Sequence, residues 1–248
     1  MSMGKPYNTT QLNPDQAFER HVYHRDVFGH FLRWSHTLKR AKIGMKILDV
    51  GCGSGNLYEV FYRNRYAPAR FVGLDIRNQT IEKNKLKFPK AEWMSVDLVK
   101  QNLPKDDWDI ISSYELAEHI GKQNVPQFLD NIKKVMSEKT VLLISTPCHD
   151  GTCADNHRYD SGDGRGVAPQ ELTFEEMKSL LEERFTIEKV YGTFASIKDY
   201  KHLMNDWQQK MFDELSSYYD SNILSVMMAP FFPAQSRNAL WVCKLRSR

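Results

Sequence analysis

Short apolar runs and longer amphipathic stretches alternate along this 248-residue chain. The apolar runs are six to nine residues long and rich in β-branched or aromatic side chains, which is typical of buried strands. Seven runs are predicted as strands: residues 45–50, 70–76, 91–98, 108–114, 140–146, 185–190 and 237–245. Between these runs, apolar residues recur at helical spacing, which predicts helices at residues 57–65, 81–88, 125–136 and 172–184. Strands that alternate with helices predict a doubly wound, mainly parallel α/β sheet.

Helical additions are expected at both ends of this alternation. Residues 18–42 carry aromatic and apolar side chains at roughly helical spacing. Residues 198–219 are predicted as one amphipathic helix, with an i, i+4 stripe formed by Leu203, Trp207, Met211 and Leu215. We expect a helical extension at residues 1–42, a main domain at residues 43–248 and, within it, a helical insertion at about residues 196–236. The last strand, at or near a sheet edge, can pair antiparallel.

The composition is that of a globular protein, with 41% apolar and 26% charged residues. No apolar run approaches the roughly 18 residues that a membrane span needs, and the first residues do not resemble a secretory signal. Four cysteines are few for this length, so we expect a reduced, cytoplasmic setting without disulfides. A net charge of +3 permits nucleic-acid binding but does not favour it.

A glycine-rich turn follows the first predicted strand. Gly51, Gly53 and Gly55 occupy every second position, which removes Cβ atoms and lets the backbone approach a ligand. A dinucleotide fingerprint would read Gly-x-Gly-x-x-Gly, and a phosphate loop would end in Gly-Lys-Ser/Thr. Neither pattern is present, so the turn does not indicate a nucleotide phosphate site.

Acidic residues mark the ends of the first three predicted strands: Asp49, Asp75 and Asp97. A carboxylate at the end of the second strand is well placed to accept both hydroxyls of a ribose. Asp49 would attract an ammonium group and repel a pyrophosphate. The pattern therefore favours a cationic or zwitterionic nucleoside, and S-adenosylmethionine has the required sulfonium, amino group, ribose diol and adenine.

With these motifs, residues 45–150 resemble the class I S-adenosylmethionine-dependent methyltransferases. The resemblance implies their seven-stranded Rossmann-like fold and a cofactor site formed by Asp49, Gly51, Gly53, Asp75, Ile76, Asp97 and Leu98. In that site Gly51 and Gly53 line the methionine part and Asp75 holds the ribose. Asp97 and Leu98 border the adenine.

A second motif, Glu115-x-x-Glu118-His119, follows the fourth predicted strand. If these residues start a helix or form a one-turn loop, Glu115 and Glu118 lie on one face, with His119 adjacent. Two neighbouring carboxylates with an imidazole suit Mg²⁺, Mn²⁺ or Zn²⁺. The other interpretation is a solvated helix start, where acidic residues are common.

The motif resembles Glu-x-x-Glu-His in two methyltransferase groups, the small-RNA 3′-terminal ribose 2′-O-methyltransferases and the ubiquinone-pathway O-methyltransferases. In the RNA group a later histidine completes a metal site, and His157 is the best match here, with His149 as the alternate. The resemblance implies a metal bound by Glu115, Glu118, His119 and His157. Cys148 stands where the RNA group has Asn. The glycine-rich segment after it is predicted to be a lid or, with Cys148, Cys153, His157 and His149 as ligands, a structural zinc site.

These features predict a methyltransferase that, with a divalent metal, methylates a hydroxyl on a small molecule or sugar. Glu115 and His119 are the candidate catalytic residues, with His119 as general base if it does not bind metal. Methylation of an RNA end, metal-independent catalysis, and a weakly active cofactor-binding protein that works through a partner are the alternatives. The N-terminal helices and the insertion, with residues such as Arg33 and Trp207, are expected to wall the acceptor pocket.

Overall fold

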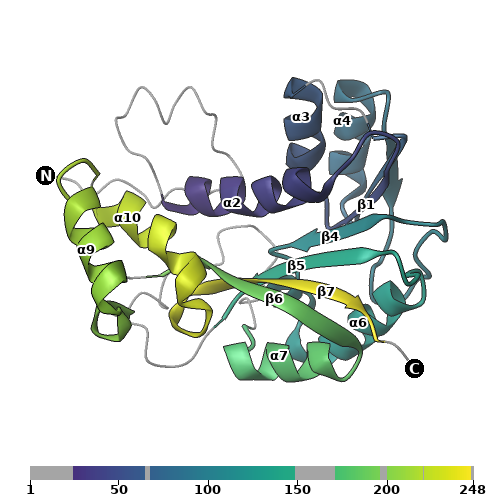
Figure 1. Ribbon diagram of the computed structural model, residues 1–248. Coiled ribbons are helices and arrows are strands. Elements are labelled where there is room, and N and C mark those ends of the chain that lie inside the picture. Colours follow the sequence, from purple (N-terminus) through teal and green to yellow (C-terminus); the bar gives the residue numbers. More distant parts are fainter. Residues whose placement is uncertain (1–24, 65–67, 149–170, 196–199, 220, 247–248) are drawn as a thin grey trace, which may run out of the picture.

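The computed structural model describes residues 25–64, 68–148, 171–195, 200–219 and 221–246. Its centre is a seven-stranded sheet in the order β3-β2-β1-β4-β5-β7-β6 (Figure 1). The strands are β1 (Lys46–Val50), β2 (Arg70–Asp75), β3 (Glu92–Ser95), β4 (Ile110–Tyr114), β5 (Val141–Pro147), β6 (Phe185–Phe194) and β7 (Asn238–Leu245). β7 is antiparallel to both neighbours, and the other pairings are parallel. The predicted fold class is confirmed, and the strand order turns back between β1 and β4, where α/β sheets bind ligands.

Helices cover both faces of the sheet. In Figure 1, α3 and α4 lie above it, α6 and α7 lie below, and α9 and α10 lie beyond the carboxyl ends of the parallel strands. The α-helices are α2 (Arg25–Arg40), α3 (Asn56–Arg63), α4 (Asn78–Lys87), α5 (Ala117–Ile120), α6 (Val125–Lys133), α7 (Phe174–Glu182), α9 (Asp206–Leu215) and α10 (Ser221–Met228). Short 3₁₀ turns are η2 (Lys122–Asn124), η3 (Lys201–Leu203), η4 (Ala229–Phe231) and η5 (Pro233–Gln235). No helix in the described part of the chain has the length and apolar character that crossing a bilayer requires.

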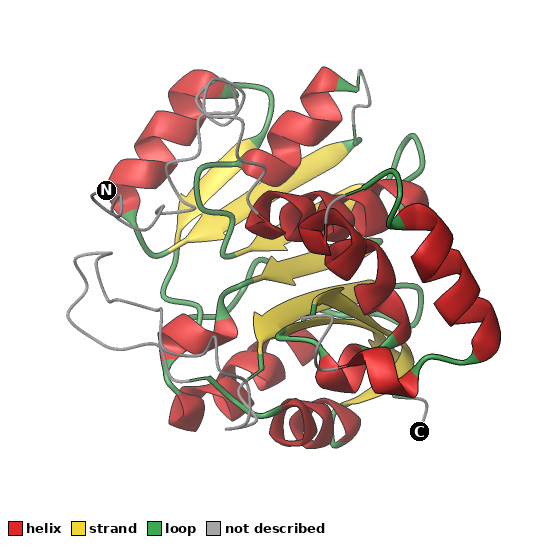
Figure 2. Ribbon diagram, turned by 90° about the vertical axis from the view of Figure 1, so that its left-hand side faces the viewer, coloured by secondary structure: helices red, strands yellow, loops and turns green. Residues whose placement is uncertain are grey.

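Figure 2 shows the sheet between helices on both of its faces. A separate apolar core lies on each face of the sheet. One core packs Phe61 of α3 and Ile81 of α4 against the strands, and the other packs Phe128 of α6 and Met177 of α7. Strands covered on both faces must be apolar on both, which explains why they read as continuous apolar runs.

The helix predicted over residues 198–219 is wrong in extent. The segment contains η3, then α9 alone, and a separate helix α10 follows that the sequence pattern did not predict. Asn205 begins α9, because its side chain accepts the backbone N–H of Gln208 while the Gln208 side chain accepts the N–H of Asn205. Trp207 of the predicted stripe is exposed, and Phe212 is the buried residue of α9.

The third strand ends earlier than predicted, at Ser95. Asp97 lies in the turn beyond it, where one carboxylate oxygen accepts the backbone N–H groups of Val99 and Lys100, each at 3.1 Å. A short acidic side chain that caps its own backbone favours a turn over an extended strand.

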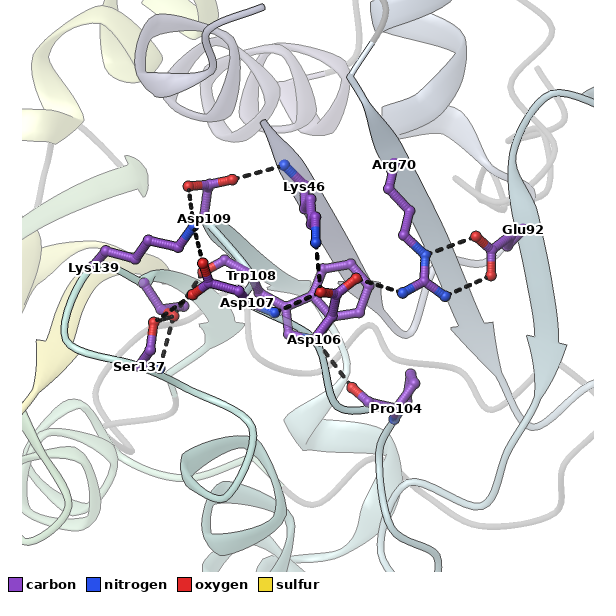
Figure 3. A network of polar contacts seen from close by, with 11 residues as sticks. Lys46, Arg70, Glu92, Pro104, Asp106, Asp107, Trp108, Asp109, Ser137 and Lys139 are labelled. Atoms are coloured by element: carbon purple, nitrogen blue, oxygen red, sulfur yellow. Dashed lines mark hydrogen bonds and ion pairs between the residues drawn. The ribbon is translucent and has the colours of Figure 1, made fainter. Parts of the chain in front are cut away.

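The amino edge of the sheet, where the parallel strands begin, is joined by ion pairs (Figure 3). Asp106, in the loop before β4, accepts Lys46 Nζ at 2.6 Å and Arg70 Nη1 at 2.5 Å. Arg70 also donates from Nε and Nη2 to the two carboxylate oxygens of Glu92, at 2.7 and 2.8 Å. The first residues of β1, β2 and β3 are therefore tied together.

Candidate functional site

The glycine turn after β1 needs its glycines for conformation and for packing. Gly51, Gly53 and Gly55 have φ angles of 84°, 51° and 76°, a region that disfavours side chains. A Cβ at Gly51 would lie 2.9 Å from a methyl carbon of Leu116, and one at Gly55 would lie 2.8 Å from the indole of Trp93. The turn therefore packs directly against the segment that carries the Glu-x-x-Glu-His motif.

Asp49 in β1 is a buried carboxylate, 4% exposed. Its Oδ1 accepts a hydrogen bond from Ser112 Oγ of β4 at 2.8 Å. Burial raises the pKa of Asp49 to about 7, against the lowering effect of Ser112, and the charge of Asp75 raises it further. A cationic ligand beside this carboxylate would favour its ionised form.

Asp75 ends β2, as predicted, and is also buried, at 6% exposed. Its carboxylate accepts the backbone N–H of Gly53 at 3.1 Å and that of Arg77 at 2.9 Å. The Arg77 guanidinium donates to both carboxylate oxygens, from Nε at 3.0 Å and Nη2 at 3.1 Å. Burial raises the pKa of Asp75, but the hydrogen bonds and charge of Arg77 outweigh it, so that this pKa lies below its ordinary value.

The other predicted cofactor residues lie at the same edge. Ile76 follows Asp75 and is 60% exposed, so its side chain is open to a ligand. Leu98 is buried in the core below the sheet. The Asp97 carboxylate caps its own turn. The predicted roles of these three residues beside an adenine stay predictions.

The Glu-x-x-Glu-His motif does not lie on one helix, because its first residues form a turn before α5. Glu115 follows β4 with a left-handed φ of 53°, and α5 begins only at Ala117. The turn nevertheless brings the carboxylates near enough that the charge of Glu115 raises the pKa of Glu118. Left-handed backbone is uncommon outside glycine and is often found at functional sites.

Glu115 is held by side chains from three other elements. Its Oε1 accepts Ser145 Oγ of β5 at 2.8 Å and lies 3.4 Å from Arg33 Nη1 of α2. Its Oε2 accepts Asn238 Nδ2 of β7 at 2.5 Å. These contacts fix the carboxylate between β4, β5, β7 and the N-terminal helix.

Glu118 is 2% exposed, and its described partners are Thr146 and His119. Thr146 Oγ1 donates to its Oε2 at 3.0 Å, and His119 Nε2 lies 3.7 Å from its Oε1. Burial first, then the charges of Glu115 and Glu171, raise the pKa of Glu118 well above its ordinary range. The two neighbouring carboxylates differ from Glu118 in having an arginine partner. Glu115 faces Arg33, and Glu171 is paired with Arg237 at 2.9 Å.

A divalent metal was predicted at Glu115, Glu118, His119 and His157, and His157 lies outside the described residues. Among the residues that the structure describes, no three acidic, His or Cys side chains form a group that could hold a metal ion. Both oxygens of Glu115 accept hydrogen bonds, and Arg33 supplies a positive charge beside one of them. The described side chains therefore do not fit a metal at Glu115, and the metal site stays a prediction.

The segment after β5 is described only at its start. Cys148 is buried, and its Sγ donates to the carbonyl of Thr146 at 3.7 Å. Burial, with the nearby charges of Glu115 and Glu171, raises the pKa of this thiol. Such a thiol is a poor zinc ligand, and the predicted partners Cys153, His149 and His157 lie outside the described residues.

Several residues of this edge were not predicted as site residues. Arg77 stands two positions after Asp75, a spacing that could have suggested the contact. Asn238 and Glu171 meet Glu115 and Arg237 only through the tertiary fold, so the sequence held no local signal for them. Arg33 was expected to wall an acceptor pocket, but it is a buried partner of Glu115.

Comparison with known proteins identifies the family. A family model described as a methyltransferase domain matches residues 23–230. The ubiquinone biosynthesis O-methyltransferase of Rhodopseudomonas palustris (strain BisB5) is 31% identical over 107 residues, covering 42% of this chain and 40% of that protein. A probable S-adenosylmethionine-dependent methyltransferase of Mycolicibacterium smegmatis is 25% identical over 155 residues, covering 61% of this chain and 56% of that protein. The matches thus span 40% and 56% of the lengths of these relatives.

Solved structures share the fold at low identity. A TehB-like SAM-dependent methyltransferase from Corynebacterium glutamicum has a TM-score of 0.58 and 17% identity, covering 94% of this chain and 97% of that one. The N-methyltransferase NodS from Bradyrhizobium japonicum, in complex with S-adenosyl-L-homocysteine, has a TM-score of 0.54 and 14% identity, covering 90% and 87%. The chain therefore belongs to the methyltransferase-domain family and has the class I S-adenosylmethionine-dependent methyltransferase fold that the sequence predicted.

Proposed function

We propose that the protein transfers the methyl group of S-adenosylmethionine to a hydroxyl oxygen of a small molecule or sugar. The observation that carries the proposal is the pair of buried carboxylates, Asp49 and Asp75, at the carboxyl ends of adjacent strands. Asp49 suits the cationic methionine part of the cofactor, and Asp75 suits the ribose hydroxyls. The turn from Gly51 to Gly55 lies between them.

The acceptor would bind beside His119, at the end of β4. His119 is proposed to take the hydroxyl proton while the oxygen attacks the methyl carbon and the carbon–sulfur bond breaks, leaving S-adenosylhomocysteine. Glu118 Oε1 lies 3.7 Å from His119 Nε2, which is too far for a hydrogen bond, so Glu118 borders the imidazole without accepting from it. Alignment of oxygen, methyl and sulfur would supply much of the rate.

The choice of an oxygen acceptor is supported by the relatives. The ubiquinone biosynthesis O-methyltransferases that match this chain are named for methylation of oxygen. They match over 107 residues, which is 42% of this chain. The acceptor itself therefore rests on the local chemistry of this chain.

The charges at the carboxyl edge favour a neutral acceptor over a nucleic-acid end. In the described part of this edge, Arg33 faces Glu115 and Arg237 is paired with Glu171, while Glu118 has no such arginine. A phosphate-rich end is usually held by unpaired basic side chains. Methylation of an RNA end is thus the less favoured alternative.

Whether a metal assists the reaction is a separate proposal with its own test. It would require His157 to join Glu118 and His119, and Arg33 to leave Glu115. If the metal binds there, it would lower the pKa of the acceptor hydroxyl and orient the oxygen. His119 would take the hydroxyl proton only if it does not bind the metal.

The test is a methyl-transfer assay with S-adenosylmethionine carrying a radioactive methyl group. Acceptors should include catechols, simple phenols, sugars and a short RNA with a free 3′ end, each with EDTA and with added Mn²⁺. We expect label on a neutral hydroxyl compound. Label on RNA alone would support the alternative, and cofactor binding without turnover on any acceptor would favour a protein that works through a partner.

A further inference from the structure

The strongest unexplained feature of the cofactor edge is the set of donors on Asp75. Four donors converge on its carboxylate, two from the backbone N–H groups of Gly53 and Arg77 and two from the Arg77 guanidinium. A carboxylate offers about four lone-pair positions. In this arrangement each oxygen accepts two hydrogen bonds, so none is left for a further donor.

A ribose needs the same two oxygens. Its vicinal hydroxyls are two donors side by side, as are Nε and Nη2 of an arginine in the fork geometry seen on Asp75. The diol and the guanidinium are therefore alternative partners of the carboxylate. They cannot both bind with full hydrogen bonds.

Of the four donors, the two of the guanidinium are on a side chain, which can change its rotamer. The backbone donors belong to the glycine turn and to the start of α4, which the fold holds in place. The Arg77 side chain is 41% exposed, against 8% for Asp75. Its Nη2 also lies 3.6 Å from where a Cβ of Gly53 would be, over the turn that should face the cofactor.

We infer that Arg77 competes with the ribose hydroxyls for Asp75, so that the cofactor must displace its guanidinium and binds less tightly than the pocket alone would allow. This inference rests on the proposed cofactor site. It assigns Arg77 two effects. Without cofactor, Arg77 keeps the buried carboxylate of Asp75 paired. When cofactor binds, only the molecules in which Arg77 has left Asp75 can bind the ribose fully, so the apparent affinity for the cofactor is lower.

The variant that tests this is Arg77→Met, which keeps much of the side-chain length but cannot donate. We expect S-adenosylhomocysteine to bind about two- to fivefold more tightly to the variant than to wild type, the range for a half-exposed ion pair. Isothermal titration calorimetry measures this directly. Arg77→Lys, which keeps the charge but loses the fork, should fall between the two.

Salt gives a second readout. Raising the salt concentration screens the Arg77–Asp75 pair, so wild-type affinity for S-adenosylhomocysteine should rise with salt while that of Arg77→Met stays nearly flat. A cofactor analogue without the two ribose hydroxyls cannot use Asp75, so it should gain nothing from the substitution. Arg63→Gln, which removes an exposed arginine paired with Glu59, is the matched control and should change neither value.

The outcomes separate the inference from the proposed function. If wild type binds S-adenosylhomocysteine but Arg77→Met and Arg77→Lys bind it equally or less tightly, Arg77 does not compete and the inference is wrong. If wild type and variants all fail to bind it, the proposed cofactor site is wrong. Thermal unfolding of each variant with and without ligand shows that the protein is folded and should give a larger ligand-induced stabilisation for Arg77→Met.

Discussion

Two carboxylates at opposite edges of the sheet, Asp106 and Asp49, have opposite surroundings. At the amino edge Asp106 lies within 2.6 Å of both Lys46 and Arg70, and these partners hold its pKa well below the ordinary range. At the carboxyl edge Asp49 is buried beside a serine, and burial raises its pKa to about 7. Glu118 follows the same direction, with burial as the main cause.

The different surroundings of Asp106 and Asp49 indicate that the first carboxylate serves stability and the second serves ligand binding. A carboxylate with two cationic partners near the surface has nothing left to offer a ligand (Figure 3). A buried carboxylate without a cationic partner, such as Asp49, is costly in the unliganded protein, and that cost is relieved when a cation binds. Substitutions at the two edges should therefore differ in sign as well as in size.

The largest expected effect is on turnover at His119. His119→Asn should lower the rate of methyl transfer by about 10²- to 10⁴-fold, the range for loss of a general base. Cofactor affinity should hardly change, because the described contacts of Asp49 and Asp75 do not include this side chain. Steady-state kinetics with calorimetric binding would check this, and a variant with unchanged turnover would remove His119 from the mechanism.

Asp49→Asn should stabilise the folded protein and lower its affinity for the cofactor. The folded pKa of Asp49, about 7, lies above the unfolded value of about 3.9, so the stability that its protonated form provides is lost as pH rises between them. The amide does not ionise, so the variant should be about 1–3 kcal/mol more stable than wild type at pH 8. The advantage should vanish near pH 4.

Urea unfolding at pH 8, 6 and 4 measures the Asp49→Asn prediction. Wild type should lose stability relative to the variant across this series as pH increases. A variant that is less stable than wild type at pH 8 would mean that Asp49 is ionised and well paired, and the contrast between the edges would fail.

Asp106→Asn should have the smallest effect and the opposite sign. It weakens the ion pairs to Lys46 and Arg70, and partly exposed pairs contribute little because water and salt screen them. We expect the melting temperature to fall by less than about 3 °C, and by less still at 1 M salt. Cofactor affinity should stay the same, so a loss of binding would show that the two edges are coupled.

Much of the fold could be predicted because its strands are buried on both faces. Such strands are mostly apolar runs, and Asp49 and Asp75 stand out in them as buried acidic residues. The insertion was harder to predict. Asn205 starts a helix by a side-chain cap, and α10 follows a turn that carries no strong periodic signal.

The acceptor end of the site depends on contacts between residues that lie far apart in the sequence. Glu115 meets Asn238 across 123 positions of the chain, and Glu171 meets Arg237 across 66. The helical spacing of Glu115 and Glu118 suggested a shared face, but a left-handed residue at the end of β4 sets their geometry instead. Local spacing in the sequence therefore points to Glu115 and Glu118 as site residues but does not predict which side chains they contact.

The central claim is that the buried carboxylates at the ends of β1 and β2 bind S-adenosylmethionine. Calorimetric titration of wild type and Asp75→Ala with S-adenosylhomocysteine, and separately with NAD, tests it most directly. We predict one-to-one binding of S-adenosylhomocysteine to wild type, about 100-fold weaker binding to Asp75→Ala, and no binding of NAD. Binding of the dinucleotide in preference, or equal affinity of both proteins for S-adenosylhomocysteine, would contradict the account.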